Sequence, residues 1–238
     1  MAQKKLLRFA QIKAFENVLE YPQNMQGMWR NYFKNENPIV LELACGRGEY
    51  TVNLAKLHPN QNYIGVDVKG NRMYIGAKSA LDESIKNAAF LRTQIEKLPD
   101  YFSESEVDEI WITFPDPQLR LSKAKKRLTH PRFLRLYKKV LAAEGVIHLK
   151  TDSPDLYRFT KKVALMAGID FLADTDDAYK SSINSAELNI KTHYESLDIA
   201  GSKKIHYLKF KLPKTITNFD EQLQNEIVLD AKDSDILI

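Results

Sequence analysis

The sequence predicts an α/β protein built on a doubly wound, mostly parallel β-sheet with helices on both faces. Short apolar segments alternate with longer amphipathic ones from residue 38 to 172, which is typical of parallel strands joined by helical crossovers. Glycine, proline and acidic residues gather where the apolar segments end, and ligands of such sheets bind at the carboxyl ends of the strands. With 44% hydrophobic and 28% charged residues among 238, the composition fits one globular domain with appendages.

The first half of the sheet is predicted from three apolar runs. Pro38 opens the run 39–43, whose mostly apolar character predicts a buried strand. Two glycines separate this run from a helix predicted over 49–57, and His58-Pro59-Asn60 ends that helix. The next predicted elements are a strand at 63–67, a helix at 70–85 and a strand at 88–92.

The second half is predicted from four further runs, which bring the sheet to seven strands. Residues 107–114 predict a strand, and a helix is predicted over 131–143 because proline suits its first turn and Gly145 follows its end. Ser153 is a suitable N-cap for a helix extending to about residue 167. The remaining predicted strands are 146–149, 169–172 and 205–212.

The two ends of the chain differ from this alternating part. Residues 1–37 are amphipathic and aromatic, which predicts an N-terminal extension of helix and loop before a domain at 38–213. Residues 214–238 carry six acidic residues against two lysines and predict a peripheral acidic tail. The connection 174–202 is long and polar.

Several classes of protein are disfavoured by composition. The single cysteine, Cys45, excludes an intramolecular disulfide and a multi-cysteine zinc site, and the five histidines show no metal-ligand spacing. We therefore expect no metal. There is no apolar run of about 20 residues and no secretory signal pattern, so we expect no membrane association and a cytoplasmic location.

Positive charge is concentrated in one stretch of the chain. Residues 120–139 contain nine Lys or Arg and no Asp or Glu, although the net charge of the chain is only +4. Phe133 and Tyr137 are interleaved with these charges. A stretch this one-sided is either a solvated surface or a contact for a polyanion, and the interleaved aromatic residues favour nucleic acid.

The loop after the first predicted strand has the character of a nucleotide site. Gly46 and Gly48 allow the backbone to approach a ligand closely, and Asp67, at the end of the second strand, is placed to accept hydrogen bonds from ribose hydroxyls. Glu42 and Glu49 would repel a pyrophosphate but attract the amino group and sulfonium of S-adenosylmethionine. We therefore favour S-adenosylmethionine over a dinucleotide.

The fourth strand leads into Phe114-Pro115-Asp116-Pro117. The two prolines restrict the backbone on either side of one carboxylate, which would hold Asp116 rigidly at the carboxyl end of a strand. Such an arrangement favours a catalytic role for Asp116 over an ordinary Pro-Asp turn.

The chain resembles the bacterial tRNA (guanine-N7-)-methyltransferase family. The matching segments are 41–48, 65–67, 114–117 with the basic cluster 123–127, 150–152 and 192–195, in family order. This resemblance implies a seven-stranded Rossmann-like methyltransferase sheet. It also implies methylation of N7 of the guanine at position 46, in the tRNA variable loop, with S-adenosylmethionine as cofactor.

The resemblance also assigns roles to individual residues. It implies that the cofactor is lined by Glu42, Asp67, Gln94 and Asp116, with Asp116 also catalytic. It implies that guanosine is held by Arg120, Asp152, Thr192, His193, Tyr194 and Glu195. It implies that RNA is contacted by Ser122, Lys123, Lys125, Lys126 and Arg127. The chain departs from the family pattern at Ala44, Gln94, Gln118 and Arg120.

Guanine N7 has a free lone pair, so no general base is required, and the enzyme must mainly orient the reactants and offset the arriving positive charge. Two other interpretations stay open at this point. One is a methyl- or aminopropyl-transferase acting on a small molecule, and the other is a non-catalytic RNA-binding paralogue. The sequence does not distinguish a monomer from a homodimer.

Overall fold

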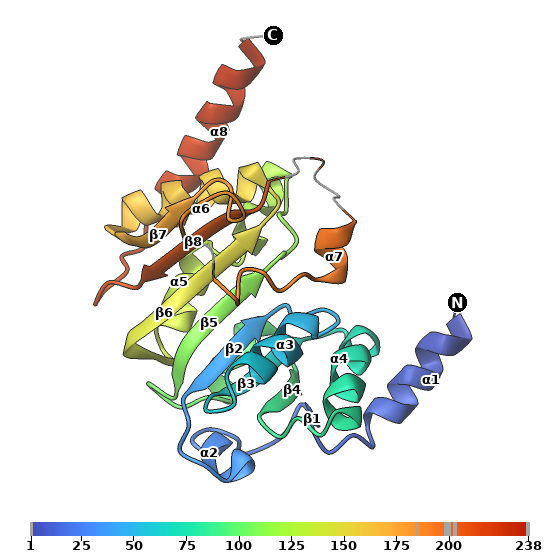
Figure 1. Ribbon diagram of the computed structural model, residues 1–238. Helices are drawn as coiled ribbons and strands as arrows, with labels where there is room; N and C mark the ends of the chain where they lie inside the picture. The colour runs from blue at the N-terminus through green and yellow to red at the C-terminus, as the bar shows by residue number, and fades with distance from the viewer. Residues whose placement is uncertain (1, 184, 198–200, 202–203, 237–238) are drawn as a thin grey trace.

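The computed structural model describes residues 2–183, 185–197, 201 and 204–236, which form an eight-stranded sheet with helices on both faces (Figure 1). The strands are β1 Val18–Glu20, β2 Ile39–Leu43, β3 Asn62–Asp67, β4 Ala88–Arg92, β5 Val107–Thr113, β6 Leu141–Thr151, β7 Phe171–Thr175 and β8 His206–Lys211. The helices are α1 Ala2–Ile12, α2 Trp29–Phe33, α3 Glu49–Leu57, α4 Gly70–Asp82, α5 Pro131–Tyr137, α6 Pro154–Ala167, α7 His193–Ser196 and α8 Asp220–Ile236. Two 3-10 segments follow β4 and β5: η1 Ile95–Asp100 and η2 Leu121–Lys126.

The sheet reverses its winding between β2 and β5. The strand order is β1-β4-β3-β2-β5-β6-β8-β7, and β8 runs in the direction opposite to the other seven strands. The chain builds outward from β2 through β3 and β4, then returns to β5 on the other side of β2. The carboxyl ends of β2 and β5 therefore lie side by side at the switch point, where a ligand site is expected. The predicted fold class is confirmed.

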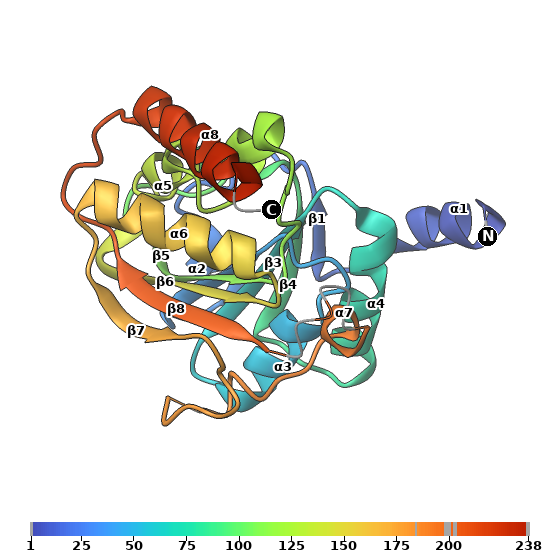
Figure 2. The same cartoon turned by 90° about the horizontal axis from the view of Figure 1, so that it is seen from above.

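Two apolar layers enclose the sheet (Figure 2). Alternate residues of β2 point to opposite faces: Leu41 packs in the layer formed with α2, α5, α6 and α8, and Val40 in the layer formed with α1, α3 and α4. Both side chains are almost fully buried. The near-continuous apolar sequence of this strand follows from its burial on both faces.

The sheet has eight strands rather than the predicted seven. The additional strand, β1, lies in the segment predicted as helix and loop and pairs with β4 from Val18 to Glu20. Asn17 fixes the start of β1. Its side-chain amide donates to the backbone carbonyl of Ala77, and its backbone carbonyl accepts from the N–H of Phe90. A three-residue edge strand contains too few residues to show an alternating pattern.

The predicted helix at 131–143 is too long. Helix α5 ends at Tyr137, and β6 begins at Leu141, where it pairs with Val107 through an irregular register. Gly145, expected just beyond a helix, lies inside β6 against the side chain of Leu141. Pairing with β5 outweighs the helix propensity of the intervening alanines.

Both ends of the described chain carry a helix. Helix α1 extends away from the body and packs on α4, with Ile12 buried (Figures 1 and 2). Helix α8, which the sequence did not predict, buries Leu223 and Ile227 and is tied to α5 by Asp220, which accepts two hydrogen bonds of 2.8 and 2.9 Å from Arg135. The division of the chain at residues 38 and 213 stays a prediction. Among the described residues there is no helix long and apolar enough to cross a membrane.

Candidate active site

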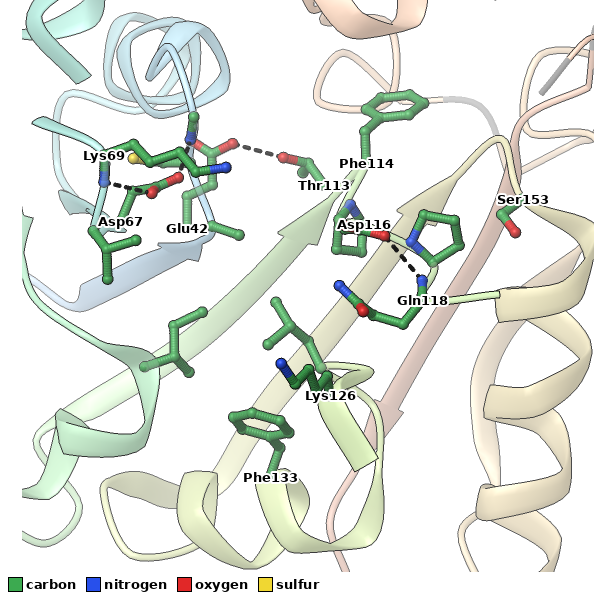
Figure 3. A pocket seen from close by; sticks show the side chains of 18 of the residues that line it. Glu42, Asp67, Lys69, Thr113, Phe114, Asp116, Gln118, Lys126, Phe133 and Ser153 are labelled. Atoms are coloured by element: carbon green, nitrogen blue, oxygen red, sulfur yellow. Dashed lines mark hydrogen bonds between the residues drawn. The ribbon is translucent and has the colours of Figure 1, made fainter. Parts of the chain in front are cut away.

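A cavity of about 1050 Å³ lies at the carboxyl ends of β2, β3, β4, β5 and β6. Figure 3 shows Glu42 and Asp67 on one side of it and Asp116 and Ser153 on the other. The predicted site residues that line it are Glu42, Gly46, Asp67, Gln94, Asp116, Lys126, Asp152 and Thr192. The topology thus brings into one cavity side chains that are up to 150 positions apart in sequence.

The loop after β2 is fastened to the loop after β3. Asp67 accepts a hydrogen bond of 2.9 Å from the backbone N–H of Gly46 and another of 2.8 Å from that of Lys69. Gly46 has φ +54°, and Ala44 adopts φ +57°, a left-handed conformation that costs a non-glycine residue roughly 1 kcal/mol. Asp67 therefore fixes the shape of this loop and also lines the cavity.

Gly48 has a packing function in the structure. It caps the start of α3 with φ +69°, and a Cβ there would lie 2.4 Å from the ring of Phe90. It is not among the residues that line the cavity. The cofactor-binding role of Gly48 stays a prediction. On this geometry Gly48 would act by fixing the shape of the loop.

Glu42 is a buried carboxylate, 3% exposed, at the end of β2. It accepts hydrogen bonds from the backbone N–H of Thr51 at 2.8 Å, from the Thr51 hydroxyl, and from the Thr113 hydroxyl at 2.6 Å. Burial raises the pKa of Glu42 from 4.5 to about 7, although these hydrogen bonds oppose the shift. The sequence alone did not indicate the two threonines.

The Asp116 loop has an unusual backbone. Phe114 and Gln118, one on each side of Pro115-Asp116-Pro117, have φ of +46° and +48°, a region that bulky residues rarely adopt. The N–H of Gln118 donates to Asp116 Oδ1 at 3.0 Å (Figure 3). One carboxylate oxygen is thereby fixed, and Asp116 remains exposed on the cavity wall.

Lys150, fully buried at the end of β6, anchors the segment that carries Thr192. Its ammonium donates to the carbonyls of Leu188 at 2.9 Å and Ile190 at 2.8 Å, and lies 3.2 Å from Glu195 Oε2. Burial lowers the pKa of Lys150 from 10.5 to about 8.

The other carboxylate oxygen of Glu195 accepts from Tyr179. Both oxygens of Glu195 are therefore engaged inside the protein. Glu195 is not among the residues that line the cavity, and its role in holding guanosine stays a prediction.

The other predicted substrate residues lie at different places. Arg120 is exposed at the start of η2 and does not line the cavity. The backbone N–H of His193 donates to Glu49 at 2.7 Å, which ties α7 to α3. The side chain of Tyr194 lies outside the described part of the chain.

The predicted RNA residues divide into two groups. Ser122, Lys123, Lys125 and Lys126 are exposed on η2, whereas Arg127 is only 5% exposed. In the sequence, only the apolar Ala124, three residues earlier, distinguishes Arg127 from its basic neighbours. Among the described residues no group of three or more His, Cys, Asp or Glu could hold a metal ion.

Comparison with known proteins identifies the family. A family model described as "Putative methyltransferase" matches residues 36–208. A tRNA (guanine-N(7)-)-methyltransferase from Porphyromonas gingivalis is 48% identical, with 84% of this chain and 86% of the relative covered. One from Bacteroides fragilis is 45% identical, with 90% and 88% covered. One from Christiangramia forsetii is 44% identical, with 89% and 99% covered.

The chain belongs to the tRNA (guanine-N7-)-methyltransferase family. The resemblance drawn from the sequence motifs is therefore confirmed. Among solved structures, the 16S rRNA methyltransferase KamB matches with a TM-score of 0.60 at 16% identity, covering 79% of this chain and 94% of that one. This second likeness is one of fold.

Replacing Glu42 by glutamine should remove a pH dependence of stability. In the folded state the pKa of Glu42 is about 7, whereas in the unfolded chain it is near 4.5. Between these two pH values the folded protein therefore keeps a proton on Glu42 that the unfolded chain has lost. The free energy of unfolding should therefore fall, by up to about 3 kcal/mol from this group, as pH rises through that window. Glu42→Gln should be close to the wild type near pH 4.5 and more stable than it above pH 7.

The measurement is urea unfolding of both proteins at intervals between pH 4.5 and 8. Glu104→Gln, at an exposed carboxylate, is the matched control and should follow the wild type throughout. Parallel stability curves for Glu42→Gln and the wild type would contradict the assignment of a buried, proton-retaining carboxyl.

Proposed function

We propose that this protein transfers a methyl group from S-adenosylmethionine to N7 of a guanine in tRNA, with position 46 of the variable loop as the target. The observation that carries the proposal is the placement of Asp116, held at a strand end, in the same cavity as the carboxylates of Glu42 and Asp67. Relatives at 44–48% identity that bear the name of this activity support it.

The β2–β4 side of the cavity fits the cofactor. The carboxylate of Glu42, whose ionised form is disfavoured by burial, is stabilised by a cationic neighbour such as an ammonium or sulfonium. Asp67 and Gln94 both line this side; Asp67 would accept from ribose hydroxyls and Gln94 would bond to adenine. When bound, S-adenosylmethionine supplies an electrophilic methyl group on its sulfonium.

The β5–β6 side of the cavity fits guanine. Asp116 and Asp152 both line it and are suited to accept from the guanine N1–H and 2-amino group. N7 carries its own lone pair, so these carboxylates orient the base and offset the positive charge that N7 methylation creates, without removing a proton. Thr192 also lines the cavity.

The exposed part of η2 fits RNA. Lys123, Lys125 and Lys126 are exposed directly after the Asp116 loop, and Lys126 also lines the cavity. A guanosine must leave its stack to enter such a cavity, and phosphate contacts at the rim would hold the flanking backbone. A small-molecule substrate would not use these charges.

The direct test is to incubate the protein with methyl-labelled S-adenosylmethionine and unmodified tRNA, digest the product and identify the labelled nucleoside. The expected product is 7-methylguanosine, mapped to the variable loop. Label on another nucleoside, or none with tRNA, would refute the proposal.

Asp116→Asn should reduce methyl transfer by at least about 100-fold, a loss typical of removing one preorganised electrostatic group. Asparagine keeps the shape and one acceptor but removes the charge that offsets the cationic ring. Thermal stability should change little, because the side chain is exposed. The measurement is single-turnover methylation with both substrates saturating, with Asp170→Asn at an exposed site as control. A near-wild-type rate would transfer the role to Asp152.

Neutralising Lys123, Lys125 and Lys126 to glutamine should weaken tRNA binding and reduce its salt dependence. Each lost phosphate contact lowers the slope of log affinity against log salt by about 0.7–0.9, so the triple variant should lose up to about three times that. Lys56, Lys161 and Lys211, which are similarly exposed but lie in ion pairs, provide a control triple variant. If both variants keep the wild-type slope, η2 is only a solvated surface.

A further inference from the structure

Arg127 is buried although it ends a run of exposed basic residues. It is 5% exposed, whereas Lys123, Lys125 and Lys126 face solvent. Its neighbour one 3-10 turn earlier, Ala124, is also buried. Arg127 directly follows η2, and its backbone N–H donates to the Ala124 carbonyl at 3.0 Å, so the last 3-10 turn brings both residues to the same inward side.

The guanidinium of Arg127 binds the backbone of the Asp116 loop. Its Nε lies 3.2 Å from the carbonyl oxygen of Pro117 and 3.3 Å from that of Gln118, and its Nη2 lies 3.2 Å from the same Gln118 oxygen. On its other side the guanidinium carbon lies 4.4 Å from the ring centre of Phe159 on α6. Arg127 thus connects the loop to a helix of the core.

These contacts act on the residue that orients Asp116. Gln118 is held with φ +48°, and in that conformation its N–H points to Asp116 Oδ1 while its carbonyl points to Arg127. A glutamine in the left-handed region is strained and persists only where its surroundings fix it. Among the described contacts, Arg127 supplies the side-chain donors to this carbonyl.

We propose that Arg127 is a positioning residue for methyl transfer: its guanidinium fixes the Pro117 and Gln118 carbonyls so that Asp116 faces the cavity, and it does not contact RNA. The inference rests on the proposed function and assigns to Arg127 a different task from that of the exposed lysines. Burial lowers the pKa of Arg127, and the aromatic face beneath it compensates part of the lost hydration.

A lysine cannot replace this contact. The guanidinium presents several N–H donors in one plane, which is how it reaches two successive carbonyls while stacked on a ring. An ammonium keeps the charge but not this geometry. If Arg127 instead bound phosphate, charge would be what matters, and Arg127→Lys would behave like the wild type.

The test compares Arg127→Lys and Arg127→Met with Lys125→Met and with Arg30→Met, which removes an arginine from an exposed ion pair with Glu36. For each variant we would measure the single-turnover rate at saturating tRNA and S-adenosylmethionine, and the salt slope of tRNA binding. Both Arg127 variants should lose about 10- to 100-fold in rate, as expected for a small misplacement of a catalytic group. Both should keep the wild-type salt slope.

Lys125→Met should differ from the Arg127 variants in the salt dependence of tRNA binding, where its slope should be reduced by about 0.7–0.9. A rate for Arg127→Lys within about twofold of the wild type, or a slope for Arg127→Met reduced as in Lys125→Met, would overturn the inference. If Arg127→Met does not fold, Phe159→Leu removes the ring beneath the guanidinium and should lower the rate without changing the slope. A wild-type protein that fails to methylate tRNA would overturn the proposed function itself, whereas active Arg127 variants overturn only this inference.

Discussion

The buried carboxylate of Glu42 joins the two halves of the cavity. It lies at the end of β2, at the switch point of the sheet, and accepts hydrogen bonds from Thr51 on α3 and Thr113 at the end of β5. The glycine loop precedes α3, and the Asp116 loop follows Thr113. A buried carboxyl group that loses one of its hydrogen-bond donors costs about 1–3 kcal/mol, which favours one arrangement of these elements. Together with the pairing of β2 and β5, this group sets the spacing between the cofactor side and the guanine side of the cavity.

The chemistry at guanine N7 explains why the backbone of this site is held in a fixed geometry. No proton has to be removed from the base, so the rate depends on how closely the reacting atoms are aligned and on the charges that face the product cation. The Asp116 loop is correspondingly strained, with two bulky residues in left-handed conformations. The strain is balanced by neighbours: the N–H of Phe114 donates to the Lys150 carbonyl at 2.8 Å, and that of Gln118 to Asp116.

The local sequence pattern was sufficient to predict the bounds of elements that are long or sharply bounded. The bounds of β2, α3 and α6 agree with those predicted, because proline, glycine and a serine cap mark their ends. Burial of charged side chains was not predictable in this way. In sequence, Arg127 resembles Lys126, and the resemblance assigned Glu195 to guanosine without indicating its ion pair with Lys150. Only the packing of α6 and of the 177–190 segment buries these two side chains. The one local signal was Ala124, an apolar residue that marks the inward side of a 3-10 turn within the basic run.

Two buried cations hold irregular backbone at the cavity. Loops without regular structure leave carbonyl oxygens that need donors when buried, and a single cationic side chain can supply several. Lys150 satisfies two carbonyls of the segment before Thr192, and Arg127 satisfies two carbonyls of the Asp116 loop. Each cation lies over aromatic rings, with Tyr50, Phe114 and Tyr179 about Lys150 and Phe159 below Arg127. Positive charge therefore has two functions in this chain. Exposed cations suit the binding of a polyanion, whereas buried cations fix the loops that line the cavity for its base. Net charge does not distinguish these two functions, because a cationic side chain can bind an RNA phosphate only if it is exposed to solvent rather than buried.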